Sequence, residues 1–468
     1  MKIMHYFLGF PPFHNGGLMT YAKSLAEGQK SLKHDVIMIF PGKYTKGKKS
    51  QITFYKDYQG IKIYQITNPN LVSFNGILNT DYVINYSMKN NYKEFLINEK
   101  IEILHVHSLI GFPKDLLIEA KELNIKTIFT VHDYFGICPK IQLFKYDGTL
   151  CNDYNNGYEC IKCNKNADTI KKLKIRRNLK FLKSYNLLLK IKQKSKKIYI
   201  IKKLKNRFLN NKINKNETEI NKTNNLDLRY KYLREYYINI YNLFNHIIFN
   251  SQLSEKVFSK YMNREKDKFS IVPVTLKEIK DNRSQKKVYS ENIKDLNLLY
   301  MGYLNEVKGF LKLKEVTDAL IEEDKRNFKL HIYGDDSGVN KDDFNTEYYK
   351  FYGKYNRNDL DKIFKDADAL IFPSRWYETF GFVALEAFSF GVPVIIGNNI
   401  GFSYHIKNGE NGIIYKYDYN FNNLKIVLEN ILDKPYLLRN IMVKTKKSPF
   451  NFEYQTHLKQ IMKIYNLK

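Results

Sequence analysis

The chain has 468 residues, 43% of them hydrophobic, which is enough apolar material for the cores of two or three domains. Its formal net charge is +29, so anionic partners are favoured over cationic ones. No window of 18 apolar residues free of charge exists, and Pro11 and Pro12 end the first apolar run. A membrane-spanning or secreted protein is therefore not expected, and we expect a cytoplasmic chain whose cysteines form no disulfides.

The first half alternates apolar strands with helices. A buried strand is expected at residues 2–10, followed by a loop with Gly16 and Gly17 and an amphipathic helix from Leu18 to about Leu32. Further strands are expected at residues 35–40, 101–108, 126–133, 245–251 and 268–274, with helices around 114–123 and 226–244 and a less regular stretch at 50–95. This alternation predicts a parallel sheet covered on both faces.

The alternation restarts after a polar linker at 277–295. Strands are expected at residues 297–303, 328–335, 369–374 and 392–399, with a helix after Lys308. The sequence thus predicts an α/β protein of two doubly wound domains, residues 1–283 and 284–449, and a last amphipathic helix at 450–468. Ligands of such sheets bind at the carboxyl ends of the strands, which would place a site in the cleft between the domains.

A strongly basic segment at 165–225 interrupts this pattern. Residues 169–216 contain 18 Lys or Arg and no acidic residue, so they supply much of the net charge. We predict a basic helical insertion that lies on an anionic membrane surface. A solvated charged face and a nucleic-acid-binding tail are the alternatives.

Two carboxylates stand in the most apolar segment, SRWYETFGFVALEAFSFGVPV at 374–394. We expect a helix to begin near Phe382, which leaves Glu378 on the preceding loop and puts Glu386 on the second helical turn. A carboxylate in an apolar setting needs a partner, and an ionised one accepts two hydroxyl donors. The spacing therefore predicts a ligand rich in hydroxyl groups, such as a ribose or a sugar.

An ordered set of motifs resembles the family 4 glycosyltransferases, which have the GT-B fold. The set is the E-x7-E stretch with PPFHNGG, HVH, TVHD, MGYLNEVKG and GFSYHIKNGENGIIY, and it leaves out about 50–95 and 165–225. The resemblance implies a retaining enzyme that needs no catalytic metal. It also implies that the last helix crosses back onto the N-terminal domain.

The resemblance implies a role for each matched residue of the donor site. Glu386 would bind the ribose of a nucleotide-sugar, and Glu378 would bind hydroxyls of the donor sugar. Gly16 and Gly17 would let backbone N–H groups reach the diphosphate.

The resemblance also assigns residues to the charge of the diphosphate and to the reacting sugar. Lys308 would pair with the phosphates, and His132 would lie near the sugar and the attacking acceptor hydroxyl. This sequence has Tyr303 where the family usually has Arg. Lys308 would therefore balance more of the phosphate charge, or Arg375 would help it to do so.

Each candidate also has a structural interpretation. Glu386 could be a helix-surface residue and Glu378 a solvated loop acid, while His132 could simply pair with Asp133 at a strand end. The remaining ordinary assignments are a turn for Gly16 and Gly17, a helix-start position for Lys308, and packing roles for His105 and Trp376.

Cys138, Cys151, Cys160 and Cys163 are the four cysteines of the chain. Their C-x12-C-x8-C-x2-C spacing ends in a metal knuckle, and four thiolates suit structural zinc. A subset of family 4 enzymes has a similar run, matched by HDYFGICPK, YDGTLC and CIKC. The alternative is reduced thiols in a folded loop.

The expected function is glycosyl transfer from a nucleotide-sugar, a UDP-sugar before a GDP-sugar, to a lipid-linked saccharide of bacterial capsule, O-antigen or exopolysaccharide. Such an enzyme would act on the cytoplasmic face of the membrane, without nucleic acid. A GT-B epimerase or phosphorylase, a basic RNA-binding protein and an inactive homologue are the rival interpretations.

Overall fold

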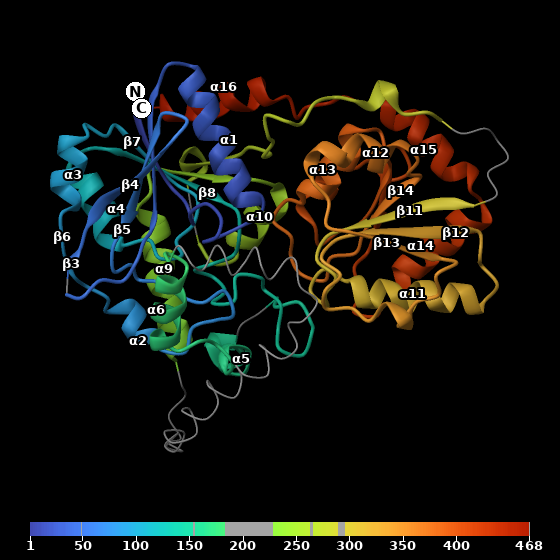
Figure 1. The fold of residues 1–468 in the computed structure, drawn as a ribbon, viewed down its shortest axis with the longest axis horizontal. Helices are drawn as coiled ribbons and strands as arrows, with labels where there is room; N and C mark the ends of the chain where they lie inside the picture. Colours follow the sequence, from blue (N-terminus) through green and yellow to red (C-terminus); the bar gives the residue numbers. More distant parts are fainter. Residues whose placement is uncertain (48, 153–154, 183–227, 263–264, 289–294, 468) are drawn as a thin grey trace.

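The structure is a computed structural model that describes residues 1–47, 49–152, 155–182, 228–262, 265–288 and 295–467. Figure 1 shows two lobes side by side, each built around its own sheet. The basic segment at 183–227, which is most of the predicted insertion, lies outside the described residues.

The N-terminal sheet has eight strands in the order β10-β9-β8-β7-β1-β2-β5-β4. The strands are β1 (Lys2–Tyr6), β2 (Asp35–Pro41), β4 (Ile52–Tyr58), β5 (Ile61–Ile66), β7 (Ile103–Val106), β8 (Lys126–Val131), β9 (His246–Phe249) and β10 (Phe269–Ile271). A separate two-stranded sheet joins β3 (Lys49–Ser50) to β6 (Lys89–Asn90). Most neighbours pair in parallel, as the apolar runs predict.

The edge of this sheet differs from the prediction. β4 and β5 form an antiparallel hairpin within the stretch expected to be less regular. Gln59 and Gly60 join the strands, both with positive φ, at 50° and 72°. A two-residue turn with positive φ at both positions matches the twist of a hairpin, and the Gln-Gly pair is the signal that the prediction missed.

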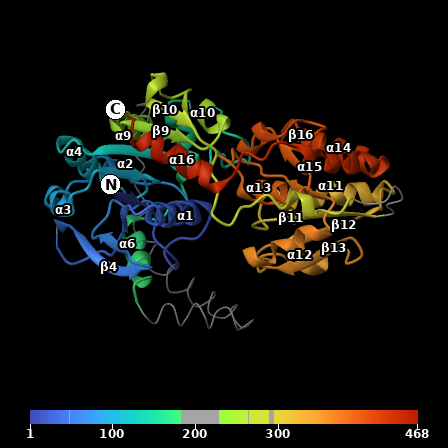
Figure 2. The same ribbon diagram turned by 90° about the horizontal axis from the view of Figure 1, so that it is seen from above.

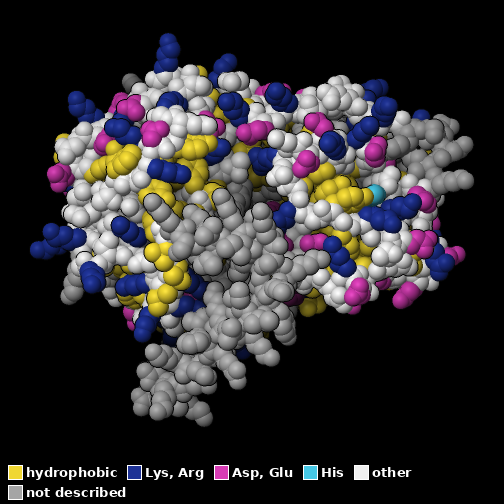
Figure 3. Space-filling model, in the orientation of Figure 1, with side chains coloured by type: hydrophobic (Ala, Val, Ile, Leu, Met, Phe, Trp, Pro, Cys, Tyr) yellow, Lys and Arg dark blue, Asp and Glu magenta, His cyan; other side chains and the backbone are white. Residues whose placement is uncertain are grey.

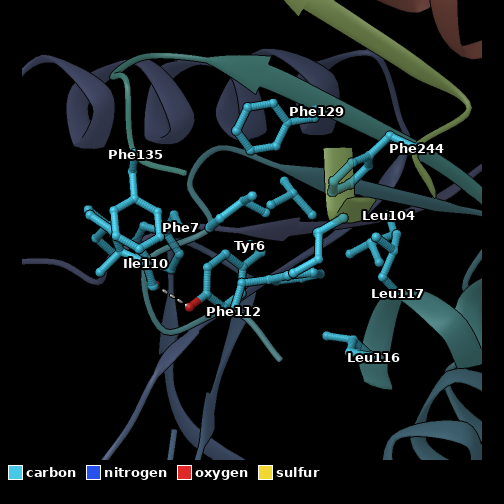
Figure 4. Close-up of a cluster of buried hydrophobic side chains, with 14 of the residues drawn as sticks. Tyr6, Phe7, Leu104, Ile110, Phe112, Leu116, Leu117, Phe129, Phe135 and Phe244 are labelled. Atoms are coloured by element: carbon cyan, nitrogen blue, oxygen red, sulfur yellow. Dashed lines mark hydrogen bonds between the residues drawn. The ribbon is translucent and has the colours of Figure 1, made fainter. Parts of the chain in front are cut away.

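Helices cover the N-terminal sheet on both faces. They are α1 (Gly17–Ser31), α2 (Thr80–Ile84), α3 (Tyr92–Asn98), α4 (Lys114–Glu122), α5 (Tyr158–Asn164), α6 (Ile170–Leu179), α9 (Arg229–Leu243) and α10 (Gln252–Phe258). Figure 4 shows part of the core that they enclose. Tyr6 lies inside this core, and its buried hydroxyl is satisfied because it donates to the Ile110 carbonyl at 2.7 Å.

The C-terminal sheet has six strands, all parallel, in the order β13-β12-β11-β14-β15-β16. The strands are β11 (Leu296–Met301), β12 (Phe328–Tyr333), β13 (Tyr349–Gly353), β14 (Ala369–Phe372), β15 (Val394–Gly397) and β16 (Gly412–Tyr415). The helices are α11 (Phe310–Glu322), α12 (Leu360–Lys365), α13 (Phe382–Ser389), α14 (Asn422–Asp433), α15 (Tyr436–Lys447) and α16 (Tyr454–Tyr465). The helix expected to begin near Phe382 begins at that residue.

The last helix, α16, lies on the N-terminal lobe. Figures 1 and 2 both show it beside α1, close to the N-terminus of the chain. Tyr454 donates from its hydroxyl to the Ser24 carbonyl of α1 at 2.5 Å. A buried apolar cluster that includes Tyr21, Phe402 and Leu458 joins α1, the C-terminal lobe and α16. Burial of these side chains ties the two lobes together.

The described start of the basic segment is packed onto the protein. α6 is capped by Thr169, and Arg177 on its last turn is buried. The Arg177 guanidinium lies 4.6 Å from the Phe13 ring centre and donates to the Gly42 carbonyl. Residues 170–179 therefore form a helix that packs on the N-terminal lobe, where aromatic rings and a carbonyl contact the buried cation.

Charge on the described surface is mixed. On the face shown in Figure 3, Lys and Arg alternate with Asp and Glu over both lobes. None of the described helices is long and apolar enough to span a bilayer.

Candidate functional site: the cleft between the lobes

Three helices begin at a glycine on the strand-end edges that face the cleft. The N-cap residues of α1, α11 and α13 are Gly16, Gly309 and Gly381, and none of them offers a side-chain cap. The first N–H group of α11, on Phe310, donates to the Asn305 carbonyl at 3.2 Å. The first N–H groups of α1 and α13 are left for a ligand, and the helix dipoles favour an anion there.

Close contacts explain two glycines, one against a side chain and one against backbone. A Cβ on Gly17 would lie 2.8 Å from Cδ2 of Phe382, the first residue of α13. The starts of α1 and α13 therefore meet across the cleft. A Cβ on Gly309 would lie 1.8 Å from the Pro373 carbonyl oxygen, and Gly309 has a φ of 74°. Only glycine fits that position, next to Lys308.

Lys308 and Glu378 contact each other directly. The Lys308 Nζ lies 2.9 and 2.7 Å from the two carboxylate oxygens of Glu378. Ser374 donates from its hydroxyl to the same carboxylate at 3.0 Å, and the Lys308 ammonium lies 4.9 Å from the centre of the Trp376 ring. Lys308, which the resemblance assigned to the phosphates, and Glu378, which it assigned to the donor sugar, lie side by side in the structure.

Glu386 is buried, with 3% of its surface exposed, and its partner is Arg357. The Arg357 Nη2 lies 3.2 Å from Glu386 Oε1, while its Nη1 lies 3.8 Å from Glu278. Burial raises the pKa of Glu386 to about 7, and Arg357 opposes that rise. Glu386 is therefore not the helix-surface residue of the alternative interpretation.

Arg375 holds the two lobes together. Its Nη1 donates to Glu306 at 2.9 Å, and its Nη2 donates to the Gly148 carbonyl of the N-terminal lobe at 3.2 Å. The guanidinium also lies within 5.6 Å of the Phe144 ring centre. The residue that replaces the family's arginine, Tyr303, is 59% exposed and supplies no charge.

The 373–381 loop, between β14 and α13, meets the N-terminal lobe at several points. Thr379 donates from its hydroxyl to the His132 carbonyl at 3.0 Å and accepts from Asn250 Nδ2 at 3.1 Å. Tyr377 donates from its hydroxyl to Asn152 at 2.5 Å. This loop carries Glu378, whose backbone is also bonded within its own lobe, to Asn399 at 3.1 Å and to Gly401 at 2.8 Å, so contacts on both sides position that carboxylate.

His132 follows β8 and is partly buried. Its Nε2 lies 3.3 Å from Nδ1 of His107. Burial lowers its pKa to about 3, so the ring is neutral. Asp133 accepts from the Phe135 N–H instead of pairing with His132, which argues against the strand-end pair.

The four cysteines converge on one small cavity. Cys138, Cys151, Cys160 and Cys163 all line it, as does the buried Arg234. Burial raises the pKa of the Cys151 thiol to about 12. Gly148, which Arg375 contacts, lies in the loop between Cys138 and Cys151.

A larger open cavity of about 750 Å³ lies between the lobes, against the 373–381 loop. Three lysines line it, Lys256 of α10, Lys260 just after that helix and Lys416 just after β16. Its other notable lining side chains are Tyr377, Tyr404, Tyr417, Tyr419, Asn398 and Asn399. A wall of lysines and tyrosines suits an anionic saccharide.

Some site residues were not predicted from the sequence. Arg357 follows β13 and Asn250 follows β9, and both reach the site only through the sheet topology. Ser374 belongs to the 374–394 stretch and lies four residues before Glu378, so its contact with that carboxylate could have been predicted from the sequence.

Comparison with known proteins matches each lobe to a glycosyltransferase family. Residues 281–448 match the family described as glycosyl transferases group 1, and residues 15–159 match glycosyltransferase family 4. An uncharacterised protein of the cps region of Klebsiella pneumoniae is 29% identical over 143 residues, 31% of this chain and 37% of that protein. An uncharacterised glycosyltransferase of Methanocaldococcus jannaschii is 29% identical over 179 residues, 36% of this chain and 44% of that protein. The matches thus span less than half the length of these relatives.

Solved structures share the fold over their whole length. Sucrose-phosphate synthase of Thermosynechococcus elongatus has a TM-score of 0.59 at 13% identity and covers 99% of this chain and 98% of its own. HepE of Anabaena, solved with UDP and glucose, has a TM-score of 0.54 at 13% identity, with 100% of both chains covered. WaaG, described as a glycosyltransferase involved in lipopolysaccharide biosynthesis, has a TM-score of 0.54 at 13% identity, with 99% of both chains covered.

At these identities the likeness establishes the fold, and the predicted GT-B fold is confirmed. Each lobe thus matches a glycosyltransferase family, residues 15–159 in the N-terminal lobe and residues 281–448 in the C-terminal lobe, and the two lobes together have the GT-B fold.

Proposed function

We propose that this protein is a retaining hexosyltransferase that moves a sugar from a nucleotide-sugar, a UDP-sugar first, to a lipid-linked saccharide of a bacterial surface polysaccharide. The observation that carries the proposal is the convergence of glycine-started helices with Lys308, Glu378 and Glu386 on one cleft. Anion-binding backbone, a lysine and two carboxylates are the groups that a diphosphate-linked sugar needs. The resemblance of the E-x7-E motif supports retention of the anomeric configuration, and the cps-region relative supports the polysaccharide role.

In the proposed reaction the diphosphate lies at the starts of α1 and α13. Lys308 neutralises the charge that grows on the leaving nucleoside diphosphate, while sugar hydroxyls donate to Glu378. Glu386 accepts hydrogen bonds from the ribose. Since Lys308 and Glu378 are paired with each other, donor binding exchanges one ion pair for hydrogen bonds to the ligand.

Nucleotide binding tests the donor site without knowledge of the acceptor. We expect one nucleotide family among UDP, GDP and ADP to raise the melting temperature of the wild type, because a ligand of the native state stabilises it by mass action. The shift should be lost in Glu386→Ala. Loss in Lys308→Met but not in Arg375→Met would assign the phosphate charge to Lys308 alone.

The opposite result has a definite meaning. If no nucleotide shifts the melting temperature and the protein instead retards RNA at moderate salt, the transferase proposal is wrong. A nucleotide would also raise the melting temperature of an epimerase or a phosphorylase. NMR analysis of the products and of their anomeric configuration separates those reactions from glycosyl transfer.

The raised pKa of Glu386 predicts a pH dependence. Because the folded protein holds this proton more tightly than the unfolded chain does, Glu386 stabilises the fold below about pH 4.5, and that contribution is lost as pH rises through about 7. Nucleotide binding needs the ionised form of Glu386, so the affinity for nucleotide increases as the pH rises. We expect the affinity to rise roughly tenfold from pH 6 to pH 8 by calorimetry. Glu386→Gln is the control, and an equal pH slope in both proteins would contradict the assignment.

We place the acceptor saccharide in the open cavity beside the 373–381 loop, whose lysines suit phosphate or carboxylate groups. Membrane docking through the basic segment would bring a lipid-linked acceptor to that cavity. Each Lys or Arg near an anionic leaflet contributes roughly 1 kcal/mol. We expect the full chain to float with anionic vesicles and a chain lacking 183–227 to stay behind, while equal flotation of both would refute the docking.

We also propose that the four cysteines hold a structural zinc ion. All four line one cavity, and zinc with four thiolates carries a net charge of −2, which the neighbouring Arg234 would partly balance. Such a site supports the fold and leaves no position open for catalysis. Elemental analysis of protein purified without chelator should give about one zinc per chain, with less in Cys160→Ser. A zinc-free wild type would disprove the proposal.

A further inference from the structure

A chain of hydrogen bonds runs from His132 into the core of the N-terminal lobe. His132 Nε2 lies 3.3 Å from His107 Nδ1, and His107 Nε2 lies 3.0 Å from His5 Nδ1. His5 Nε2 then lies 2.6 Å from Oε1 of Gln29, on α1. The three histidines follow or belong to the parallel strands β8, β7 and β1, so the sheet itself places their rings in a row.

The inner end of this chain is fixed by the last helix. Gln29 Nε2 donates to the Tyr465 hydroxyl of α16 at 3.0 Å. That hydroxyl lies 2.6 Å from His105 Nδ1, and His105 Nε2 lies 2.7 Å from the Thr130 hydroxyl. With its amide nitrogen bound to Tyr465, Gln29 turns its oxygen to His5.

The buried rings are neutral. His5, His105 and His107 are fully buried, and burial lowers the pKa of His5 to about 4 and the pKa values of His105 and His107 well below the usual range. Each ring therefore has one N–H and one lone pair. These three rings lie close enough to suggest a metal site. All six of their ring nitrogens, however, already take part in the hydrogen bonds given above, so no set of lone pairs points at a common centre.

One fixed acceptor sets the direction of every bond. The Gln29 oxygen can only accept, so His5 donates from Nε2 and must accept at Nδ1. His107 then donates from Nε2 and accepts at Nδ1, where His132 donates from Nε2. The lone pair of His132 is left on Nδ1, and no other described residue forms a hydrogen bond with that atom.

We propose that Gln29, His5 and His107 are positioning residues that hold His132 as the Nε2–H tautomer. His132 Nδ1 then accepts a hydrogen bond from a hydroxyl of the bound sugar and repels a carboxylate at the same place. The inference deepens the proposed function, on which it rests, by naming the substrate class as a neutral hydroxyl-bearing sugar in preference to a uronic acid. A lone pair facing a hydroxyl makes a bond, whereas one facing a carboxylate leaves both groups unsatisfied.

The opposite direction is a distinct and detectable state. If the Gln29 amide were turned over, its oxygen would face Tyr465, every bond of the chain would reverse, and His132 would present N–H at Nδ1. That tautomer would favour a carboxylate or phosphate. The tautomer of His132 therefore decides between the two specificities.

Nitrogen-15 NMR of histidine side chains in the full-length protein reads this tautomer directly. The chain has 10 histidines, so His132→Asn assigns the signal. We expect a protonated Nε2 and an unprotonated Nδ1 in the wild type and in Gln29→Glu, which keeps an accepting oxygen. Gln29→Met, or Tyr465→Phe if that variant does not fold, should give a mixture of tautomers. His246→Asn removes another buried histidine, bonded to Ser270, and should leave the His132 signal unchanged.

A protonated Nδ1 in the wild type, or an unchanged signal in both Gln29→Met and Tyr465→Phe, would overturn the proposal. Donor selectivity is the second measurement, made with UDP-glucose and UDP-glucuronic acid. We expect the wild type to bind the neutral sugar about tenfold more tightly, with the ratio reduced in Gln29→Met. Absence of binding by either compound would count against the UDP-sugar donor and not against the tautomer, because the NMR result needs no ligand. Tighter binding of the acid would contradict the inference.

Discussion

The site depends on the contact of one loop with the opposite lobe. Thr379 in the 373–381 loop is bonded to the His132 carbonyl and to Asn250, while Tyr377 is bonded to Asn152. These bonds cross between two domains that are otherwise separate sheets. They bind the loop that carries Glu378 to the N-terminal lobe, in addition to the apolar cluster that also joins the two lobes.

Ion pairs and a hydrogen bond within the C-terminal lobe balance the charge of the cleft before a ligand arrives. Glu378 is held by Lys308 and Ser374, and Glu386 by Arg357. A buried carboxylate without a partner would be costly, and breaking a buried pair costs about 3–5 kcal/mol. Hydroxyl donors of a sugar and a ribose can take over these roles, which makes the pairs a resting arrangement of a binding site.

Much of this arrangement could be predicted from the sequence. The spacing of Glu378 and Glu386 placed one on a loop and one on a helix that begins at Phe382, because a strand, a glycine and an apolar run have local signals. Arg357 and Asn250 were missed because only the strand order brings them to the site. The β4–β5 hairpin was missed because its turn is Gln-Gly and not a commoner pair. The sequence suggested a packing role for His105 and a place near the sugar for His132. It did not reveal the row of histidine rings, because the direction of its bonds depends on Gln29 and Tyr465, which lie far apart in the chain.

The most direct test is an experimental structure of the protein with the nucleotide that raises its melting temperature. We expect ribose hydroxyls on Glu386, phosphate oxygens at the start of α1 with Lys308 Nζ beside them, and a longer distance between Lys308 and Glu378. A nucleotide bound instead among Lys256, Lys260 and Lys416 in the open cavity would contradict it.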